Sequence, residues 1–188
     1  MPNNDKSSLL IMDLQNGIAS RFAEEDLIPF QKAIEAARKN DIPVIYVRIA
    51  FREGYPELNP RNNMAARIAQ YGGMSTTDEA TQIHESVKPE PGEPIVTKLR
   101  VSAFSGSDLE IILRSLQIDT LILTGIATSG VVLSTLREAA DRDYKLKVLA
   151  DACLDGDPEV HRVLMEKVFP RQAEVLTTEA WIHSLVAH

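Results

Sequence analysis

The chain has 188 residues, 44% of them hydrophobic, which is enough for one domain with a full core. Its formal net charge of -7 argues against a nucleic acid or an anionic membrane as partner. The single cysteine excludes a disulfide framework and fits a reducing cytoplasm, and no stretch is apolar for long enough to be a signal or membrane segment. We therefore expect one cytoplasmic domain over residues 1–188.

Short apolar runs alternate with helical patterns in the first part of the chain. Residues 9–12 predict a buried strand that ends at Asp13, and residues 43–49 predict a second strand. Between them, residues 24–40 predict a helix whose inner face carries Leu27, Phe30, Ile34 and Ala37.

A long irregular segment follows, from Phe51 to Gly92, with one short helical pattern at residues 65–71. Such segments usually cover a site, contact another subunit or are poorly ordered. We expect this one to close over the strand ends. Arginines in and before it offer carboxylate contacts, although solvated surface charge is their commoner role: Arg48, Arg52, Arg61 and Arg67.

The central part predicts two more strands, each followed by a helix. Residues 94–97 form the first and deliver Lys98, and the helix after it turns Leu109, Ile112, Leu113 and Leu116 inward. Residues 121–123 form the second, and the helix behind it packs Val132, Leu136, Ala139 and Ala140 on the sheet. The turn between them, residues 125–131, lies at a strand exit and a helix start, where backbone N–H groups can hold an anion or an oxyanion.

The last part repeats the alternation. Residues 146–150 predict a strand whose exit carries Cys153, and Asp157-Pro158 opens a helix with Val160, Val163, Leu164 and Val168 inward. A strand at residues 174–176 and a helix around Trp181 close the chain. Strands that alternate with helices predict a three-layer α/β/α fold with a mostly parallel sheet.

Three separated blocks resemble the isochorismatase-like hydrolases, a family that includes nicotinamidases, carbamoyl-amide hydrolases and isochorismatase itself. They are LLIMDLQ at residues 9–15, TKLRVSAF at residues 97–104, and GIATSGV at residues 125–131. Each block is weak alone, but their order and spacing are fairly specific. The resemblance implies a doubly wound sheet, which would bring Asp13 and Lys98 to one sheet edge.

The family's catalytic set is an Asp after the first strand, a Lys after the third and a Cys at the start of the helix. Asp13 and Lys98 match the first two, whereas the Cys position, counted without gaps from Gly125, falls on Val131. Valine cannot form a thioester, so this alignment removes covalent thiol chemistry. Isochorismatase-type members, which cleave a vinyl ether, also lack the thiol and use the Asp as a proton donor.

Further site residues follow from the same blocks. The backbone of Ala127, Gly130 and Val131 is expected to bind an oxyanion or a carboxylate, with the family's cis peptide at Ile126-Ala127. Candidates for substrate contacts are Gln15, Arg100, Phe104, Thr128 and Ser129. Gln15 could instead fix its turn and Phe104 could be a core aromatic, and neither hydroxyl has a recognisable His base beside it.

No metal and no cofactor are predicted. Nicotinamidase-like members build a metal site from an Asp and two His residues after the second strand, where this chain has no His. The histidines lack ligand spacing with one another or with cysteine: His84, His161, His183 and His188.

The sequence thus favours a hydrolase that acts on a small polar metabolite, of vinyl ether or amide type, through Asp13 and Lys98. The substrate is the expected small-molecule partner, and family members commonly form homo-oligomers. Two alternatives remain: a non-catalytic binding or scaffold protein with the same fold, and a cysteine hydrolase that uses Cys153.

Overall fold

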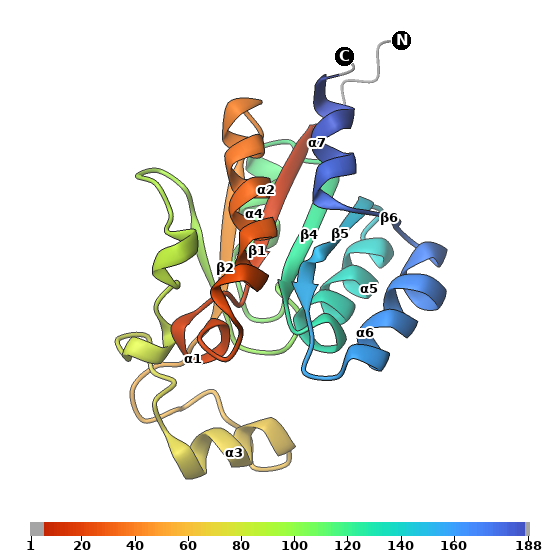
Figure 1. The fold of residues 1–188 in the computed structure, drawn as a ribbon. Coiled ribbons are helices and arrows are strands. Elements are labelled where there is room, and N and C mark those ends of the chain that lie inside the picture. The colour runs from red at the N-terminus through yellow and green to blue at the C-terminus, as the bar shows by residue number, and fades with distance from the viewer. Residues whose placement is uncertain (1–5, 187–188) are drawn as a thin grey trace.

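The fold is built on a six-stranded sheet in the order β3-β2-β1-β4-β5-β6, and each pairing is parallel (Figure 1). The computed structural model describes residues 6–186. The strands are β1 (Ser7–Met12), β2 (Val44–Ile49), β3 (Ile95–Lys98), β4 (Thr120–Ile126), β5 (Lys145–Leu154) and β6 (Glu174–Leu176). The predicted doubly wound α/β/α fold is therefore confirmed.

Helices cover both faces of the sheet. They are α1 (Asn16–Ala19), α2 (Ile28–Lys39), α3 (Asn63–Tyr71), α4 (Leu109–Ser115), α5 (Leu133–Asp141), α6 (Pro158–Val163) and α7 (Thr178–Val186). Buried side chains of α2 and α7 share one apolar cluster, and those of α4 and α5 share another on the opposite face. Among residues 6–186, no helix has the length and apolar character needed to cross a membrane.

The inner face of α2 shows how the apolar pattern fixes the packing. Leu27, Phe30, Ile34 and Ala37 are buried as predicted, with Leu27 in a short 3₁₀ turn that precedes α2. Burying one such side chain contributes roughly 1.5–3 kcal/mol, so this stripe supplies most of the helix's stability.

Two side chains that were predicted to face inward on other helices are exposed, so these predictions are wrong. Leu116 is exposed because α4 ends one residue earlier, and Val160 is exposed because α6 makes its buried contacts only beyond its end, at Leu164.

The first part of the segment from Phe51 to Gly92 forms an arm at the carboxyl-terminal end of the sheet, and its last part runs back beside α2, where the Gln31 side chain donates to the Ser86 carbonyl at 2.9 Å. Its helix, α3, starts at Asn63 because the Asn62 side chain accepts a hydrogen bond from the Met64 N–H at 3.0 Å. Ala65 is the only buried residue of α3. Figure 1 shows α3 projecting from the main body near the end of β1 and β2.

Candidate active site

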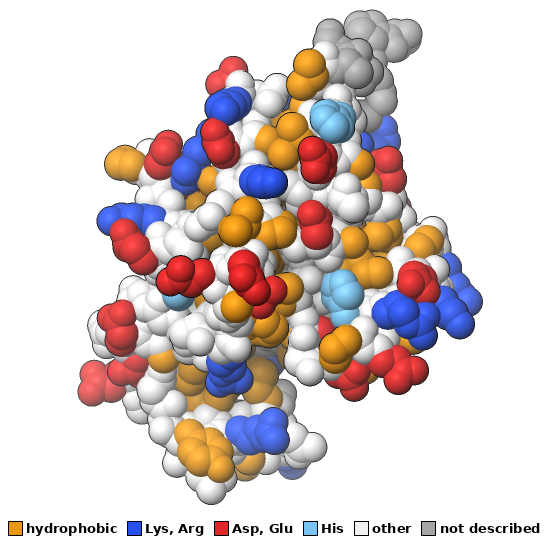
Figure 2. All heavy atoms as spheres, viewed as in Figure 1, with side chains coloured by type: hydrophobic (Ala, Val, Ile, Leu, Met, Phe, Trp, Pro, Cys, Tyr) orange, Lys and Arg blue, Asp and Glu red, His pale blue; other side chains and the backbone are white. Residues whose placement is uncertain are grey.

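A cavity of about 700 Å³ opens at the carboxyl-terminal ends of the strands. Most of its wall is apolar, which suits a small metabolite held by a few polar groups. The lining residues are Asp13, Ile18, Arg21, Phe22, Ile49, Met64, Lys98, Val101, Ile126, Ala127, Gly130, Val131, Asp155 and Gly156. Figure 2 shows a hollow where the arm with α3 meets the main body, with hydrophobic and basic side chains beside it.

Asp13 lies at the floor of the cavity, directly after β1. Its backbone is in the left-handed region (φ 60°), which aspartate tolerates better than most residues, and its N–H donates to the Val47 carbonyl at 2.8 Å. The side chain is 5% exposed, and its Oδ2 lies 3.1 Å from the Lys98 Nζ. Oδ1 is buried and has no hydrogen-bond partner among residues 6–186. Burial raises the pKa of Asp13 to about 6, although the charge and hydrogen bond of Lys98 act to lower it.

Lys98 ends β3 and is 1% exposed. Besides Asp13, its ammonium contacts the carbonyl oxygens of Arg100 and Val101, each at 2.9 Å. These three contacts use all three ammonium donors, which is what a buried lysine needs. Lys98 therefore holds Oδ2 of Asp13 in place and leaves Oδ1 as the oxygen for a ligand.

The turn between β4 and α5 forms the next wall. Gly125 packs against β1: a Cβ at this position would lie 2.7 Å from the Met12 carbonyl oxygen, so a side chain would push the two strands apart. A cis peptide joins Ile126 and Ala127, as the family resemblance implied. Residues 128–132 then form a π-type turn before α5, and this turn is kinked at Gly130, whose φ of -104° and ψ of -106° are not helical.

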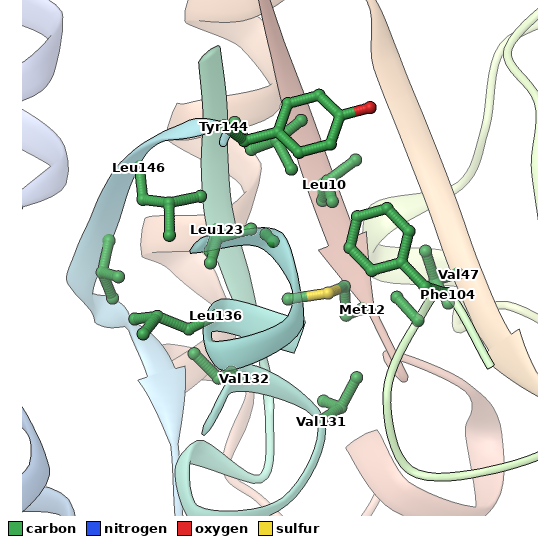
Figure 3. Close-up of a cluster of buried hydrophobic side chains, with 14 of the residues drawn as sticks. Leu10, Met12, Val47, Phe104, Leu123, Val131, Val132, Leu136, Tyr144 and Leu146 are labelled. Atoms are coloured by element: carbon green, nitrogen blue, oxygen red, sulfur yellow. The ribbon is translucent and has the colours of Figure 1, made fainter. Parts of the chain in front are cut away.

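Val131 is 2% exposed and belongs to the apolar cluster that includes Met12 (Figure 3). It also lines the cavity with Asp13 and Lys98, so all three positions predicted for the catalytic set face the same cavity. That Val131 occupies the position of the family's cysteine stays a prediction.

The backbone amides of the turn are only partly free for a ligand. Ala127, Gly130 and Val131 all line the cavity. However, the Gly130 N–H donates to the Ala127 carbonyl at 3.1 Å, and the Ser129 N–H donates to Asp155 at 2.8 Å. An oxyanion-binding role for this backbone stays a prediction, and in this conformation it would depend on Ala127 and Val131.

The hydroxyls of Thr128 and Ser129 were predicted to have no histidine beside them, and for Thr128 this prediction is wrong. Thr128 Oγ1 lies 2.7 Å from Nδ1 of His161, a residue of α6. The Ser129 hydroxyl donates to Asp155 at 2.6 Å. Burial lowers the pKa of His161, and the nearby Asp155 opposes that shift. His161 and Asp155 thus hold the turn after β4 in place through its two hydroxyl groups. No sequence motif pointed to either residue.

The other predicted substrate contacts have partners within the protein. Gln15 is fully buried, and its side chain donates to the Ile49 carbonyl and accepts from the Ile49 N–H. Arg100 donates to the carbonyls of Leu99 and Glu57. Neither lines the cavity, and their substrate contacts stay predictions.

Phe104 is a core aromatic, the second of the two roles considered for it. Its ring stacks on Tyr144 with 6.1 Å between centroids, and the Arg142 guanidinium carbon lies over the ring, 4.8 Å from its centroid. Figure 3 shows it among the apolar side chains of this face of the sheet.

Cys153 lies within β5, which extends to Leu154, rather than at the strand exit. It pairs with Gly125 across a shift in the β4–β5 register and is 1% exposed. Its sulfur is 4.0 Å from the Leu123 carbonyl, and burial raises the pKa of the thiol. Cys153 does not line the cavity, so the geometry offers no route for it to act there.

Several lining residues carried no sequence signal. Ile18, Arg21 and Phe22 come from the short segment around α1, and Met64 is the one contribution of the long segment after β2. Arg48, by contrast, is tied to Thr97 by a hydrogen bond of 3.1 Å. Within the described part of the chain, no group of three or more His, Cys, Asp or Glu is arranged to hold a metal ion.

A doubly wound parallel sheet with a buried Asp–Lys pair in a cavity at its strand ends is the arrangement typical of an α/β enzyme. Residues 7–180 match the Isochorismatase domain family, and the chain therefore belongs to the isochorismatase family of hydrolases.

Two curated proteins illustrate the similarity. The uncharacterized isochorismatase family protein YwoC of Bacillus subtilis is 32% identical over 181 residues, which cover 96% of this chain and 94% of YwoC. The ureidoacrylate amidohydrolase RutB of Pseudomonas savastanoi pv. phaseolicola is 30% identical over 212 residues, which cover 96% of this chain and 81% of RutB.

Solved structures agree in fold. An isochorismatase family protein from Burkholderia thailandensis superimposes with a TM-score of 0.85 at 26% identity, with 97% of each chain covered. The N-carbamoylsarcosine amidase of Thermoplasma acidophilum superimposes with a TM-score of 0.74 at 28% identity, over 93% of this chain and 97% of the amidase.

Proposed function

We propose that this hydrolase cleaves an amide-type bond of a small metabolite with water as the nucleophile, Asp13 as the acid–base group and no thiol. The observation that carries the proposal is the Asp13 carboxyl group. Its Oδ2 is held by Lys98, its Oδ1 has no partner among the described residues, and its pKa is raised to about 6 by burial against the opposing effect of Lys98. A group with a pKa near the working pH can both accept and donate a proton.

In the proposed reaction, Oδ1 takes a proton from the attacking water while the water oxygen bonds to the carbonyl carbon. Asp13 then returns the proton to the leaving nitrogen as the C–N bond breaks, which yields a carboxylic acid and an amine. Lys98 keeps the carboxyl group in place and offsets negative charge as it develops. The names of two similar proteins, an amidohydrolase and an amidase, support an amide-type substrate.

A second candidate is favoured by the apolar Val131 in the cavity beside Asp13. Hydrolysis of a vinyl ether needs a proton donor and no side-chain nucleophile, so protonated Asp13 would suffice. The two reactions differ in the sign of their pH dependence. With Asp13 as the base, kcat/KM rises with pH through about 6, and with Asp13 as the acid it falls.

The test is a panel of small amides, ureido compounds and vinyl ethers, followed by Asp13→Asn on any substrate found. Removal of an acid–base group should lower kcat about a hundredfold or more. Asp141→Asn, which changes an exposed aspartate of α5, is the matched control and should leave the rate unchanged. Full activity of Asp13→Asn would contradict the proposal.

A further inference from the structure

The charged side chains of the cavity differ in how they are paired. Asp13 and Lys98 contact each other. Asp155 accepts hydrogen bonds from the Ser129 N–H and hydroxyl and from the Asp157 N–H. Arg21 has no ion pair and no side-chain hydrogen bond with any residue between 6 and 186. Among the charged side chains that line this cavity, Arg21 is therefore the one with no ion pair or side-chain hydrogen bond to residues 6–186, although Oδ1 of Asp13 also lacks a partner there.

Arg21 is carried on an ordered turn. Its N–H donates to the Ile18 carbonyl at 3.2 Å, and the next residue, Phe22, donates to the Ala19 carbonyl at 3.1 Å. Ile18 and Phe22 line the same cavity, so the guanidinium stands beside apolar walls. Arg21 is exposed whereas Asp13 is buried, which places the arginine at the mouth and the acid–base pair at the floor.

Other exposed arginines do not share this setting. Arg52 pairs with Glu57, and Arg67 on α3 does not line the cavity. An unpaired arginine on the surface alone would mean little, because such side chains are usually solvated. An unpaired guanidinium that also lines the cavity of the Asp13–Lys98 pair is a candidate for contacting the substrate directly.

We propose that the substrate is an amphipathic monocarboxylate whose carboxylate is bound by Arg21 at the mouth of the cavity. A guanidinium matches a carboxylate with two parallel hydrogen bonds, and the contact gains strength where apolar walls displace water. The apolar body of the substrate lies along Ile18, Phe22 and Ile126, and its reactive bond reaches Asp13. The carboxylate at Asp155 disfavours a second negative group in the same space. This inference rests on the proposed function for the position of the reactive bond, but not for the binding of the carboxylate.

A matched pair of probes tests the carboxylate site without turnover. Cinnamate and cinnamyl alcohol share one apolar body and differ in the charged group, and neither has an amide bond to cleave. Titration of the full-length protein by calorimetry should show saturable binding of cinnamate that weakens as salt is added, and much weaker binding of the alcohol. Arg21→Gln should weaken cinnamate binding about ten- to hundredfold, as expected when charge-assisted hydrogen bonds are lost, and should leave the alcohol unaffected. Arg21→Lys should retain part of the affinity.

The controls separate this inference from the chemistry. Arg67→Gln should bind both probes as the wild type does. Asp13→Asn should still bind cinnamate, so a failed reaction mechanism would not affect this result. Unchanged cinnamate affinity in Arg21→Gln would overturn the inference. No saturable binding of cinnamate to the wild type at millimolar concentrations would overturn it as well.

Discussion

Two aspartates line the cavity, and we predict that the pKa of Asp13 lies above that of an ordinary aspartate and the pKa of Asp155 below it. Burial raises the pKa of Asp13 to about 6 against the opposing effect of Lys98. Burial also acts to raise the pKa of Asp155, but its hydrogen bonds from Ser129 and Asp157 outweigh it and hold that pKa below the usual value. A carbon-13 NMR titration of protein labelled at the aspartate carboxyl carbons measures both. Lys98→Met should raise the Asp13 midpoint further, because both contributions of Lys98 lower it.

The raised pKa has a consequence for stability. The unfolded chain releases the Asp13 proton near 3.8, whereas the folded protein holds it up to about 6. Between these values the folded state binds more protons than the unfolded state, so the free energy of unfolding falls as pH rises. A shift of this size corresponds to about 3 kcal/mol, lost mostly between pH 4 and 6.

Asp13→Asn should remove that slope. The variant also leaves Lys98 without its carboxylate, but this cost does not change with pH in the same range, so the slope is the quantity to compare. Urea unfolding at pH 4, 5, 6 and 7 should show the difference between variant and wild type moving by about 2 kcal/mol in favour of the variant, since part of the effect is already lost at pH 4. Asp141→Asn should run parallel to the wild type. Two results together would refute the raised pKa of Asp13: an NMR midpoint near 4, and a free energy of unfolding of Asp13→Asn that changes with pH as that of the wild type does.

Three further substitutions test the turn after β4 and the contacts that hold it in place. Gly125→Ala should destabilise the protein by about 1–3 kcal/mol in urea unfolding because its Cβ would clash with the backbone of β1, whereas Gly156→Ala, with open space around it, should cost little. Val131→Cys should cost about 1 kcal/mol and place in the cavity wall a thiol that iodoacetamide alkylates faster than Cys153; equal rates would contradict the position given to residue 131. His161→Ala should lower stability by about 1–3 kcal/mol, because the buried threonine hydroxyl that it contacts loses its partner, and an unchanged melting temperature would show that this contact contributes nothing.

The sequence was informative where a signal was local and periodic. The strand before Asp13 and the strand that ends at Lys98 are apolar runs followed by a charged residue, and parallel order then brings their ends to one edge. The inner face of α2 follows from helical spacing in the same way. These features depend on a few neighbouring residues, so they survive without knowledge of the rest of the fold.

The sequence was uninformative where a side chain found its partner far along the chain. Gln15 pairs with the backbone of Ile49, 34 positions away, and Thr128 pairs with His161, 33 positions away. No spacing rule links such residues, because the pairing of β1 with β2 and the contact of α6 with the turn after β4 bring them together. Arg21 is missed for a related reason: its meaning comes from the absence of a protein partner inside a cavity, which appears only once the walls are in place.

Asp13 and Asp155 show what decides the chemistry of a carboxylate here. Each follows directly after a strand of the same sheet, and each lines the same cavity, so position in the fold does not distinguish them. Their donors do. Asp155 receives several N–H and O–H groups that stabilise its charge, which makes it a fixed anion that holds the turn after β4. Asp13 receives one ammonium on one oxygen and keeps the other without a partner in the described chain, so its charge is stabilised less than burial destabilises it. A carboxylate that is left under-stabilised is the one able to exchange a proton near neutral pH, and for that reason the acid–base role is assigned to Asp13 and not to Asp155.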